Sequence, residues 1–210
     1  RRREAARSCR IQTIQDRQSL SESDLDIRRL GADEKRPLFQ CSDPDLHEFF
    51  HLDSRDGTRQ LTSVTYAVFD AGNPAAFFSL SNDAIHREET APRGWRRLVQ
   101  KIPHGKRYAS QPAVKIGRLA VASGLEGRGL GSQILDFLKW WFVTGNKTGC
   151  RFIIVDAYRK PDVLKFYLKN GFQALEEEAE ISPSDTTILM YFDLLPVSRA
   201  IAVEEQGAKP

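Results

Sequence analysis

The chain has 210 residues, of which 40% are hydrophobic and 28% are charged, as in an ordinary folded domain rather than a disordered chain. Its formal net charge of +3 is too small to indicate nucleic-acid binding by itself. No apolar run approaches the roughly 20 residues of a membrane-spanning helix, so we expect no membrane contact.

The cysteines and the chain ends indicate a single cytoplasmic domain. Cys9, Cys41 and Cys150 lie far apart, with no CxxC pair and no cluster with histidine. We therefore predict reduced thiols, no disulfide and no metal site. Residues 1–23 are rich in arginine and lack an apolar signal core, which predicts a flexible tail. A single domain is expected over residues 24–195, followed by a polar, frayed tail over 196–210.

The first elements in chain order are strands and one amphipathic helix. The segment Ser42-Asp43-Pro44 predicts a helix start, with Ser42 or Asp43 as the N-cap and proline in the first turn. The runs on either side of this helix are rich in residues that favour strands and are bounded by turn residues. The strands predicted here cover residues 25–30, 63–69 and 75–81.

A basic segment follows, in which the apolar pattern stops. It is expected to form a short helix near Trp95 and then a loop. Trp95 is predicted to pack against the sheet, with stacking on a nucleic-acid base as the alternative. The segment is interpreted either as a solvated face or as a surface for a polyanion such as tRNA. Its seven basic residues are Arg87, Arg93, Arg96, Arg97, Lys101, Lys106 and Arg107.

The second half of the chain alternates strands with amphipathic helices. An apolar strand leads into a glycine-rich turn, and a later apolar run is typical of a strand buried on both faces. This order predicts an α/β (α+β) fold in which helices flank a mixed central β-sheet. The predicted strands cover 114–121, 152–155, 172–175 and 187–194, and the predicted helices cover 132–144 and 161–169.

The glycine-rich turn is the first candidate binding site. Gly127, Gly129 and Gly131 allow positive φ angles, so that backbone N–H groups can converge at the start of the next helix. Such a turn suits a pyrophosphate. The P-loop pattern is absent, and the dinucleotide fingerprint ends on Ser132 where glycine is needed. A tight turn without a ligand remains the alternative.

Two motifs carry a resemblance to a known family. The run Gly117–Val121 followed by Gly127–Gly131 resembles the acetyl-CoA-binding motif of the GNAT N-acetyltransferase superfamily. The segment Phe166–Phe172 is similar to the Phe/Leu-Tyr-x-x-x-Gly-Phe segment of that family. Glu126 stands where the family usually has Gln or Arg, which puts one polar contact near the phosphates in doubt. The resemblance covers roughly residues 25–194.

The resemblance implies a mechanism and a set of site residues. The strand before the loop is expected to splay from its neighbour, so that the exposed backbone of the two strands holds acetyl-CoA. The N–H of Val121 would donate to the thioester oxygen. Tyr167, with an ordinary pKa near 10, would protonate the departing thiolate. Lys160 replaces a pantetheine-binding Asn found in many members. The implied acetyl-CoA contacts are Leu119, Ala120, Val121, Glu126, Gly127, Arg128, Gly129, Leu130, Gly131 and Ser132.

No general base stands out, and this bears on the acceptor. Asp156 ends a predicted strand, where a structural role is the more common one, and His104 lies in the basic segment. A substrate α-amino group, with a pKa near 8, would need little help from a base, unlike a lysine side chain.

Three functions therefore stay open. The first is acetyl transfer to a primary amine of a small molecule or protein. The second follows from a similarity of the Tyr108, Pro112 and 117–121 region to GNAT toxins, which acetylate the α-amino group of aminoacyl-tRNA and pair with a small antitoxin. The third is a non-catalytic CoA-binding module. The oligomeric state also stays open, with a dimer as one alternative.

Overall fold

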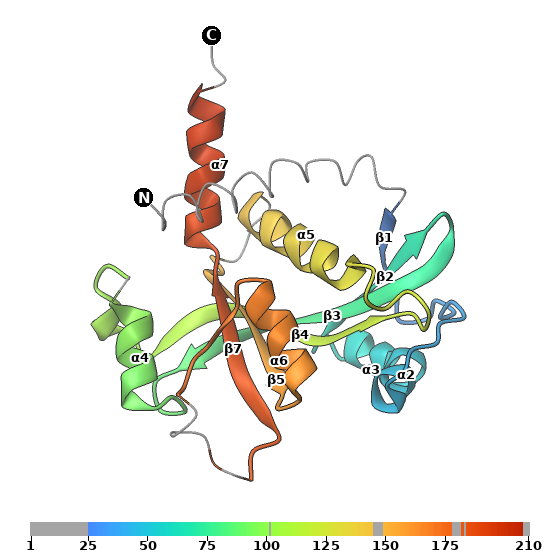
Figure 1. Cartoon of the computed structure of the whole chain (residues 1–210), viewed down its shortest axis with the longest axis horizontal. Helices are drawn as coiled ribbons and strands as arrows, with labels where there is room; N and C mark the ends of the chain where they lie inside the picture. The colour runs from blue at the N-terminus through green and yellow to red at the C-terminus, as the bar shows by residue number, and fades with distance from the viewer. Residues whose placement is uncertain (1–24, 101, 145–148, 178–181, 183, 208–210) are drawn as a thin grey trace.

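Figure 1 shows the computed structural model, which describes residues 25–100, 102–144, 149–177, 182 and 184–207. The predicted N-terminal tail and Cys9 lie outside this part of the chain, and so does Lys101. The elements in chain order are β1 (Leu25–Arg29), α2 (Pro44–His51), α3 (Asp53–Arg59), β2 (Val64–Asp70), β3 (Asn73–His86), α4 (Pro92–Val99), the 3-10 helix η2 (Gly105–Arg107), β4 (Ser110–Val121), α5 (Leu130–Thr144), β5 (Phe152–Tyr158), α6 (Pro161–Lys169), β6 (Gln173–Ala174), β7 (Thr187–Asp193) and α7 (Leu195–Gly207).

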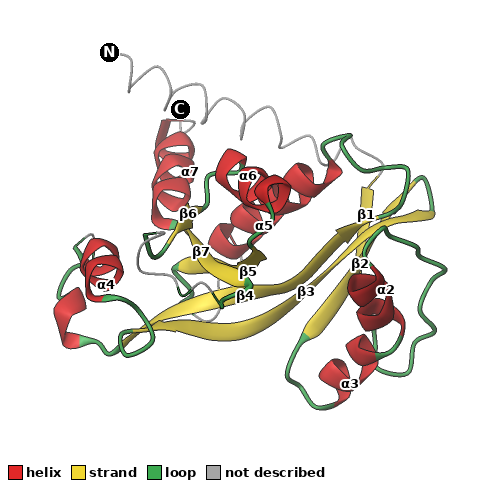
Figure 2. Ribbon diagram, turned by 60° about the horizontal axis from the view of Figure 1, so that its bottom comes forward, coloured by secondary structure: helices red, strands yellow, loops and turns green. Residues whose placement is uncertain are grey.

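These strands form one mixed sheet in the order β1-β2-β3-β4-β5-β7-β6. Strands β4 and β5 run parallel, and the other neighbours are antiparallel. Helices α5, α6 and α7 lie on one face of the sheet, and α2 and α3 lie on the other (Figure 2). This arrangement confirms the predicted α/β fold with helices on both faces of a mixed sheet.

Three apolar clusters fix the helices on the sheet. On the first face, Leu135 and Leu138 of α5 pack with Ile153 of β5. On the second face, one cluster joins α2 to the β1, β2 and β3 end of the sheet. A separate cluster joins α4 to the other end, where Trp95 packs with Phe152. Strand β5 is therefore covered on both faces, as its continuous apolar run predicts.

Helix α2 begins where the sequence predicts. The Asp43 carboxylate accepts hydrogen bonds from the backbone N–H groups of Asp45 and Leu46, and Pro44 occupies the first turn. Phe50, on the inner side of the helix, is buried in the cluster that joins α2 to the sheet. Asp43, rather than Ser42, is therefore the N-cap.

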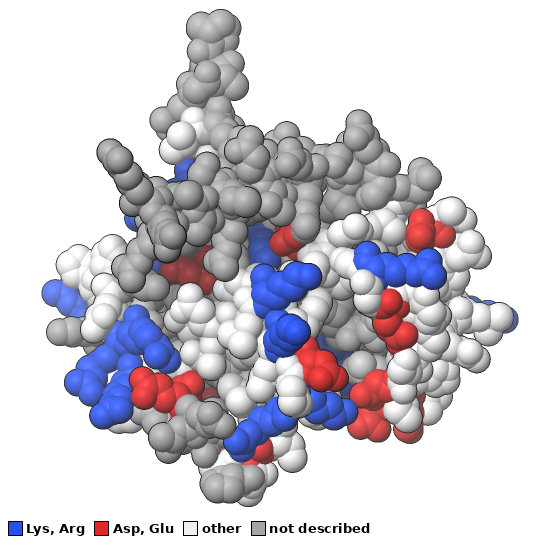
Figure 3. Space-filling model, viewed as in Figure 1, with Lys and Arg blue, Asp and Glu red and all other residues white. Residues whose placement is uncertain are grey.

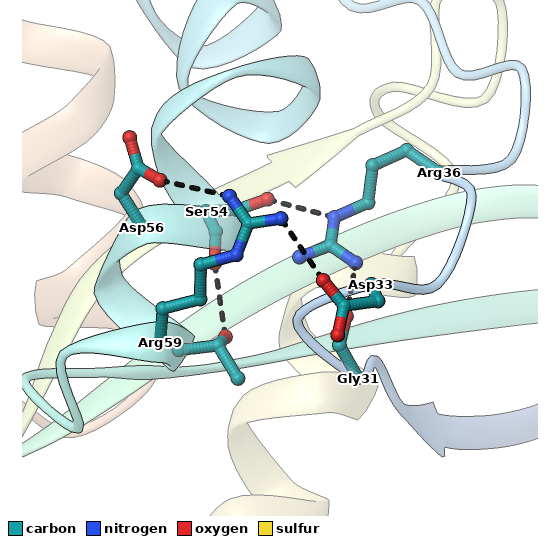
Figure 4. Close-up of polar contacts among 7 residues, drawn as sticks. Gly31, Asp33, Arg36, Ser54, Asp56 and Arg59 are labelled. Atoms are coloured by element: carbon teal, nitrogen blue, oxygen red, sulfur yellow. Dashed lines mark hydrogen bonds and ion pairs between the residues drawn. The ribbon is translucent and has the colours of Figure 1, made fainter.

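Helix α3 was not predicted, because its polar sequence shows no apolar side. A buried polar contact holds it instead (Figure 4). Arg36, before α2, donates from Nε to the Ser54 hydroxyl at 2.8 Å and from Nη1 to the Gly31 carbonyl at 2.8 Å. Arg59 reaches back to Asp33 at 2.9 Å. Burial, together with the neighbouring charge of Arg55, lowers the pKa of Arg36.

Several other elements differ in extent from the predictions, and among them β4 begins earlier, at Ser110, and β5 ends later, at Tyr158. Strand β3 runs on to His86, because the polar residues that follow residue 81 still pair along β4. Helix α4 begins at Pro92, ahead of the range expected around Trp95. Residues Leu195–Gly207 form helix α7, where a frayed tail was expected, and Val197 of this helix is buried. The division into one domain and two tails stays a prediction.

Candidate cofactor and acceptor site

Strands β4 and β5 pair over only a short length and then separate. The pairs are Ala113 with Phe152, Val114 with Ile153, and Lys115 with Ile154. Strand β4 continues to Val121 and β5 to Tyr158 without further pairing to each other. We call the point of separation, just after the Lys115–Ile154 pair, the fork. The strands splay in the way that the family resemblance implies.

A β-bulge marks the place where β4 leaves β5. Arg118 pairs with Ser79 of β3, while Ile116 pairs with the next residue, Leu80, so that Gly117 is the extra residue. A bulge bends its strand and increases the local twist. A Cβ atom at Gly117 would lie 3.1 Å from the Ser79 hydroxyl oxygen, so the close contact favours glycine. A glycine inside an apolar strand is a known signal of a bulge, so Gly117 is the residue of the sequence that could have indicated this one.

The pairing with β3 determines which backbone groups of β4 face the gap between β4 and β5. The N–H of Ala122 donates to the Ala75 carbonyl at 2.8 Å. Because hydrogen-bonded and non-hydrogen-bonded pairs alternate along an antiparallel ladder, the main-chain groups of Val121 and Leu119 face away from β3, toward the gap. The main-chain groups of Ala120 face β3, so its predicted backbone contact with a ligand gains no support from this pairing.

The glycine-rich loop adopts the backbone that the sequence predicts at two of its three glycines. Gly127 has a φ of 74° and Gly129 a φ of 91°. Gly131 instead lies in the first turn of α5, where a Cβ atom would come within 3.2 Å of the Phe166 ring. Gly131 therefore allows α5 to approach α6. The first N–H groups of α5 have no partners within the helix and open onto the loop.

The side chains around the loop make a contact that the sequence did not indicate. Glu126, which was expected near the phosphates, accepts a hydrogen bond from the Ser42 hydroxyl in the segment before α2. The N–H of Ser123 also donates to the Gln40 carbonyl at 2.9 Å. Glu126 therefore fastens the loop to the α2 side of the molecule, while Arg128 is exposed at the loop.

Tyr167 lies on α6 and is 7% exposed. Its ring packs between Phe166 and Phe172. None of the residues that the structure describes forms a hydrogen bond with its hydroxyl, and burial raises its pKa well above the ordinary value. A core tyrosine with a satisfied hydroxyl was the alternative, and the described contacts do not support it. The hydroxyl stays protonated at neutral pH and can donate to a ligand.

Asp156 lies inside β5, beyond the fork, rather than at a strand end. Its carboxylate is 2.5 Å from Nζ of Lys115, which is also 3.6 Å from the carboxylate of Asp83 on β3. Burial opposes the charge of Lys115, but the contacts with Asp156 and Asp83 leave its pKa above the ordinary value. Three charged side chains from three neighbouring strands thus meet on the second face of the sheet.

Comparison with known proteins agrees with this geometry. Residues 87–174 match the family described as the acetyltransferase (GNAT) domain. Residues 87–174 have the sequence of a GNAT acetyltransferase domain. This confirms the predicted family and enzyme class, and the fork, loop and tyrosine take the order expected for a GNAT domain.

Solved structures show the same fold over nearly their whole length. AtaT complexed with acetyl-methionyl-tRNAfMet superposes with a TM-score of 0.67 at 21% identity, covering 85% of this chain and 99% of that chain. A tyrosine-to-phenylalanine mutant of KacT gives 0.67 at 20% identity, covering 84% and 98%. AtaTR bound with AcCoA gives 0.64 at 20% identity, covering 85% and 98%. At these identities the similarity establishes the GNAT fold.

The basic segment of the GNAT domain is only partly available to a partner. Basic and acidic side chains lie together over the end of the molecule that holds α4 (Figure 3). Arg97 donates to the Leu175 carbonyl at 2.6 Å, and Arg93 lies 3.6 Å from Glu177. Trp95 is 6% exposed and cannot stack on a base. Arg87, Arg96 and Arg107 are the exposed arginines of the segment that form no ion pair within the described residues.

The described part of the GNAT domain contains no group of His, Cys, Asp and Glu side chains that could hold a metal ion. None of its helices is long and apolar enough to cross a membrane. Cys41 and Cys150 are free thiols, and burial raises the pKa of both.

Proposed function

We propose that the chain transfers an acetyl group from acetyl-CoA to a primary amine. The observation that carries the proposal is the fork, with the glycine-rich loop at its open end. The unpaired backbone of β4 matches an extended pantetheine arm, and the loop with the start of α5 matches a pyrophosphate. The open fork and the loop belong to one continuous segment, from Gly117 to Ser132.

The residues take separate roles in this proposal. Leu119 and Val121 would hold the pantetheine arm through their main-chain groups, and the Leu119 N–H, which lies nearer the fork than that of Val121, would donate to the thioester oxygen. The amine nitrogen attacks the thioester carbon, the C–N bond forms and the C–S bond breaks. The thiolate then takes the hydroxyl proton of Tyr167. Tyr167 is protonated at neutral pH and has no competing partner among the described residues.

We infer that the acceptor is the α-amino group of an aminoacyl-tRNA. AtaT, which forms a complex with acetyl-methionyl-tRNAfMet, shares the fold over 99% of its chain. The exposed Arg87, Arg96 and Arg107 supply positive charge that could meet phosphates. A tRNA acceptor would place the reaction in the cytoplasm. A small antitoxin would be a further partner, because AtaT is also known bound to the C-terminus of AtaR. A free or protein amine remains the second candidate acceptor.

Incubation with labelled acetyl-CoA and a panel of amines tests the proposal. The panel contains aminoacyl-tRNAs, a peptide with a free N-terminus and a lysine amide. Label should pass to aminoacyl-tRNA, and its binding should weaken steeply with salt, since phosphate contacts release counterions. Label on the peptide or the lysine amide alone would favour the second candidate. No label on any amine would contradict acetyl transfer.

A further inference from the structure

The closed end of the fork carries charged side chains on the second face of the sheet. The α2 cluster covers this face on one side and the α4 cluster covers it on the other. Between them lie Asp83, Lys115 and Asp156, whose side chains are 31%, 30% and 43% exposed. These residues belong to β3, β4 and β5, and Lys115 is the last β4 residue that pairs with β5.

The length of β4 places these charges relative to the reacting bond. From Ile116 to Val121 the strand has a span of roughly 16 Å at about 3.3 Å per residue. The loop that would hold the pyrophosphate follows the far end of this span, so a pantetheine arm lying along it points its thioester toward the fork. Asp156 stands two residues beyond Ile154, at that closed end. The cofactor helices α5 and α6 occupy the opposite face of the sheet.

We propose that Asp156 binds the acceptor amine and determines the specificity for amines, with Lys115 as the residue that positions it. This inference rests on the proposed acetyl transfer. Asp156 accepts a hydrogen bond from an N–H of the acceptor, which points the nitrogen lone pair at the thioester carbon. Once the C–N bond has formed, the nitrogen is cationic. Its proton passes to the Asp156 carboxylate and then to water, while the thiolate takes the proton of Tyr167.

Lys115 has a specific part in this arrangement. Its ammonium group lies between the carboxylates of Asp156 and Asp83 and balances one of their two charges. The two carboxylates and one ammonium leave one net negative charge beside the fork. That charge attracts the ammonium form of an amine, which releases one proton to water before the neutral nitrogen attacks, and it repels a carboxylate. Lys115 also restricts the Asp156 side chain, so that less freedom is lost when the acceptor binds.

Steady-state kinetics with the acceptor found in the amine panel tests this role. Asp156→Asn should lower kcat/KM for the amine by roughly 10- to 100-fold, the size of a lost hydrogen bond to a charged group. Most of the change should lie in the KM for the amine. The shift in melting temperature caused by acetyl-CoA should be unchanged. Asp156→Glu should recover part of the loss, and Lys115→Met should lose less than Asp156→Asn.

Asp70→Asn is the matched control, because Asp70 is an exposed aspartate at the end of β2, next to the β2–β3 turn. It should behave as wild type. Wild-type kinetics in a folded Asp156→Asn protein would overturn the inference. The inference would also be overturned if Asp156→Asn and Lys115→Met lowered three quantities equally: kcat/KM for the amine, the affinity for acetyl-CoA and the melting temperature. Equal losses would indicate that the ion pair has only a structural role. An inactive wild-type protein would instead contradict the proposed function.

Discussion

The two sides of the sheet around β4 are built from different chemical groups. On the cofactor side, the candidate contacts come from backbone groups of one continuous segment, positioned by glycines at Gly117, Gly127 and Gly129. On the acceptor side, they come from charged side chains on three strands and around α4. Backbone contacts tolerate many sequences and recur across a fold, whereas side-chain contacts can change with the substrate. The cofactor side should therefore be shared with relatives, and the acceptor side should distinguish this chain.

The largest expected effect is on the chemical step at the cofactor side. Tyr167→Phe removes one hydroxyl and little packing, so we expect kcat to fall by roughly 100-fold, the low end for a lost proton donor. Acetyl-CoA binding and the KM for the amine should change little. Because burial raises the pKa of Tyr167, the wild-type rate should show no loss from tyrosine ionisation up to about pH 10. An unchanged kcat would show that Tyr167 has only a packing role in the core.

A substitution in the glycine-rich loop should separate the binding of acetyl-CoA by the backbone from the stability of the protein. Gly129→Val forces a β-branched residue into a φ of 91° and should remove most of the stabilisation by acetyl-CoA in a thermal melt. Gly72, in the β2–β3 turn, has a φ of 81° and open space around its α-carbon. Gly72→Val should therefore cost similar strain, about 1–3 kcal/mol, but keep the acetyl-CoA shift. Equal responses of the two variants to acetyl-CoA would contradict the placement of the loop.

The arginines near α4 should divide into two groups. Arg87→Gln, Arg96→Gln and Arg107→Gln should each reduce the salt slope of tRNA binding by about one and leave acetyl-CoA binding intact. Arg97→Gln should instead lower stability by about 1 kcal/mol, because Arg97 donates to the Leu175 carbonyl at 2.6 Å. Salt-dependent binding measurements and thermal melts check the two groups. If the wild-type protein has no affinity for tRNA at low salt, the second candidate acceptor, a free or protein amine, would be favoured.

The smallest effect on acetyl transfer is expected from changes in the polar contact that holds α3. Ser54→Ala removes the partner of Arg36 Nε and leaves a buried guanidinium with fewer hydrogen bonds. We expect a loss of about 1–2 kcal/mol in the free energy of unfolding, measured with denaturant. Thr58→Ala, which removes a hydrogen bond to the Ser54 carbonyl, is a milder control on the same helix. Acetyl transfer should be unchanged in both variants.

The division between backbone contacts and side-chain contacts also explains what the sequence could predict. Strand alternation, the Asp43 cap and the glycine spacing are local patterns, and they predicted most elements and the loop. The charges around Lys115 come from positions 83, 115 and 156, which only the sheet pairing brings together. The role of Glu126 was missed for the same reason, since its partner Ser42 lies far away in the chain. Helix α3 has no apolar period, so no local pattern indicated it.

The extra residue Gly117 changes which side chains of β4 point toward the cofactor helices. Before it, Val114 and Ile116 point toward α5 and α6; after it, Leu119 and Val121 do, so the inward positions change from even to odd numbers. If Gly117 paired with Ser79 as an ordinary strand residue, β4 would present Arg118 and Ala120 to the cofactor helices and would turn the main-chain groups of Val121 toward β3 instead of the gap. The bulge at Gly117 therefore determines which residues of β4 beyond the fork face the cofactor helices.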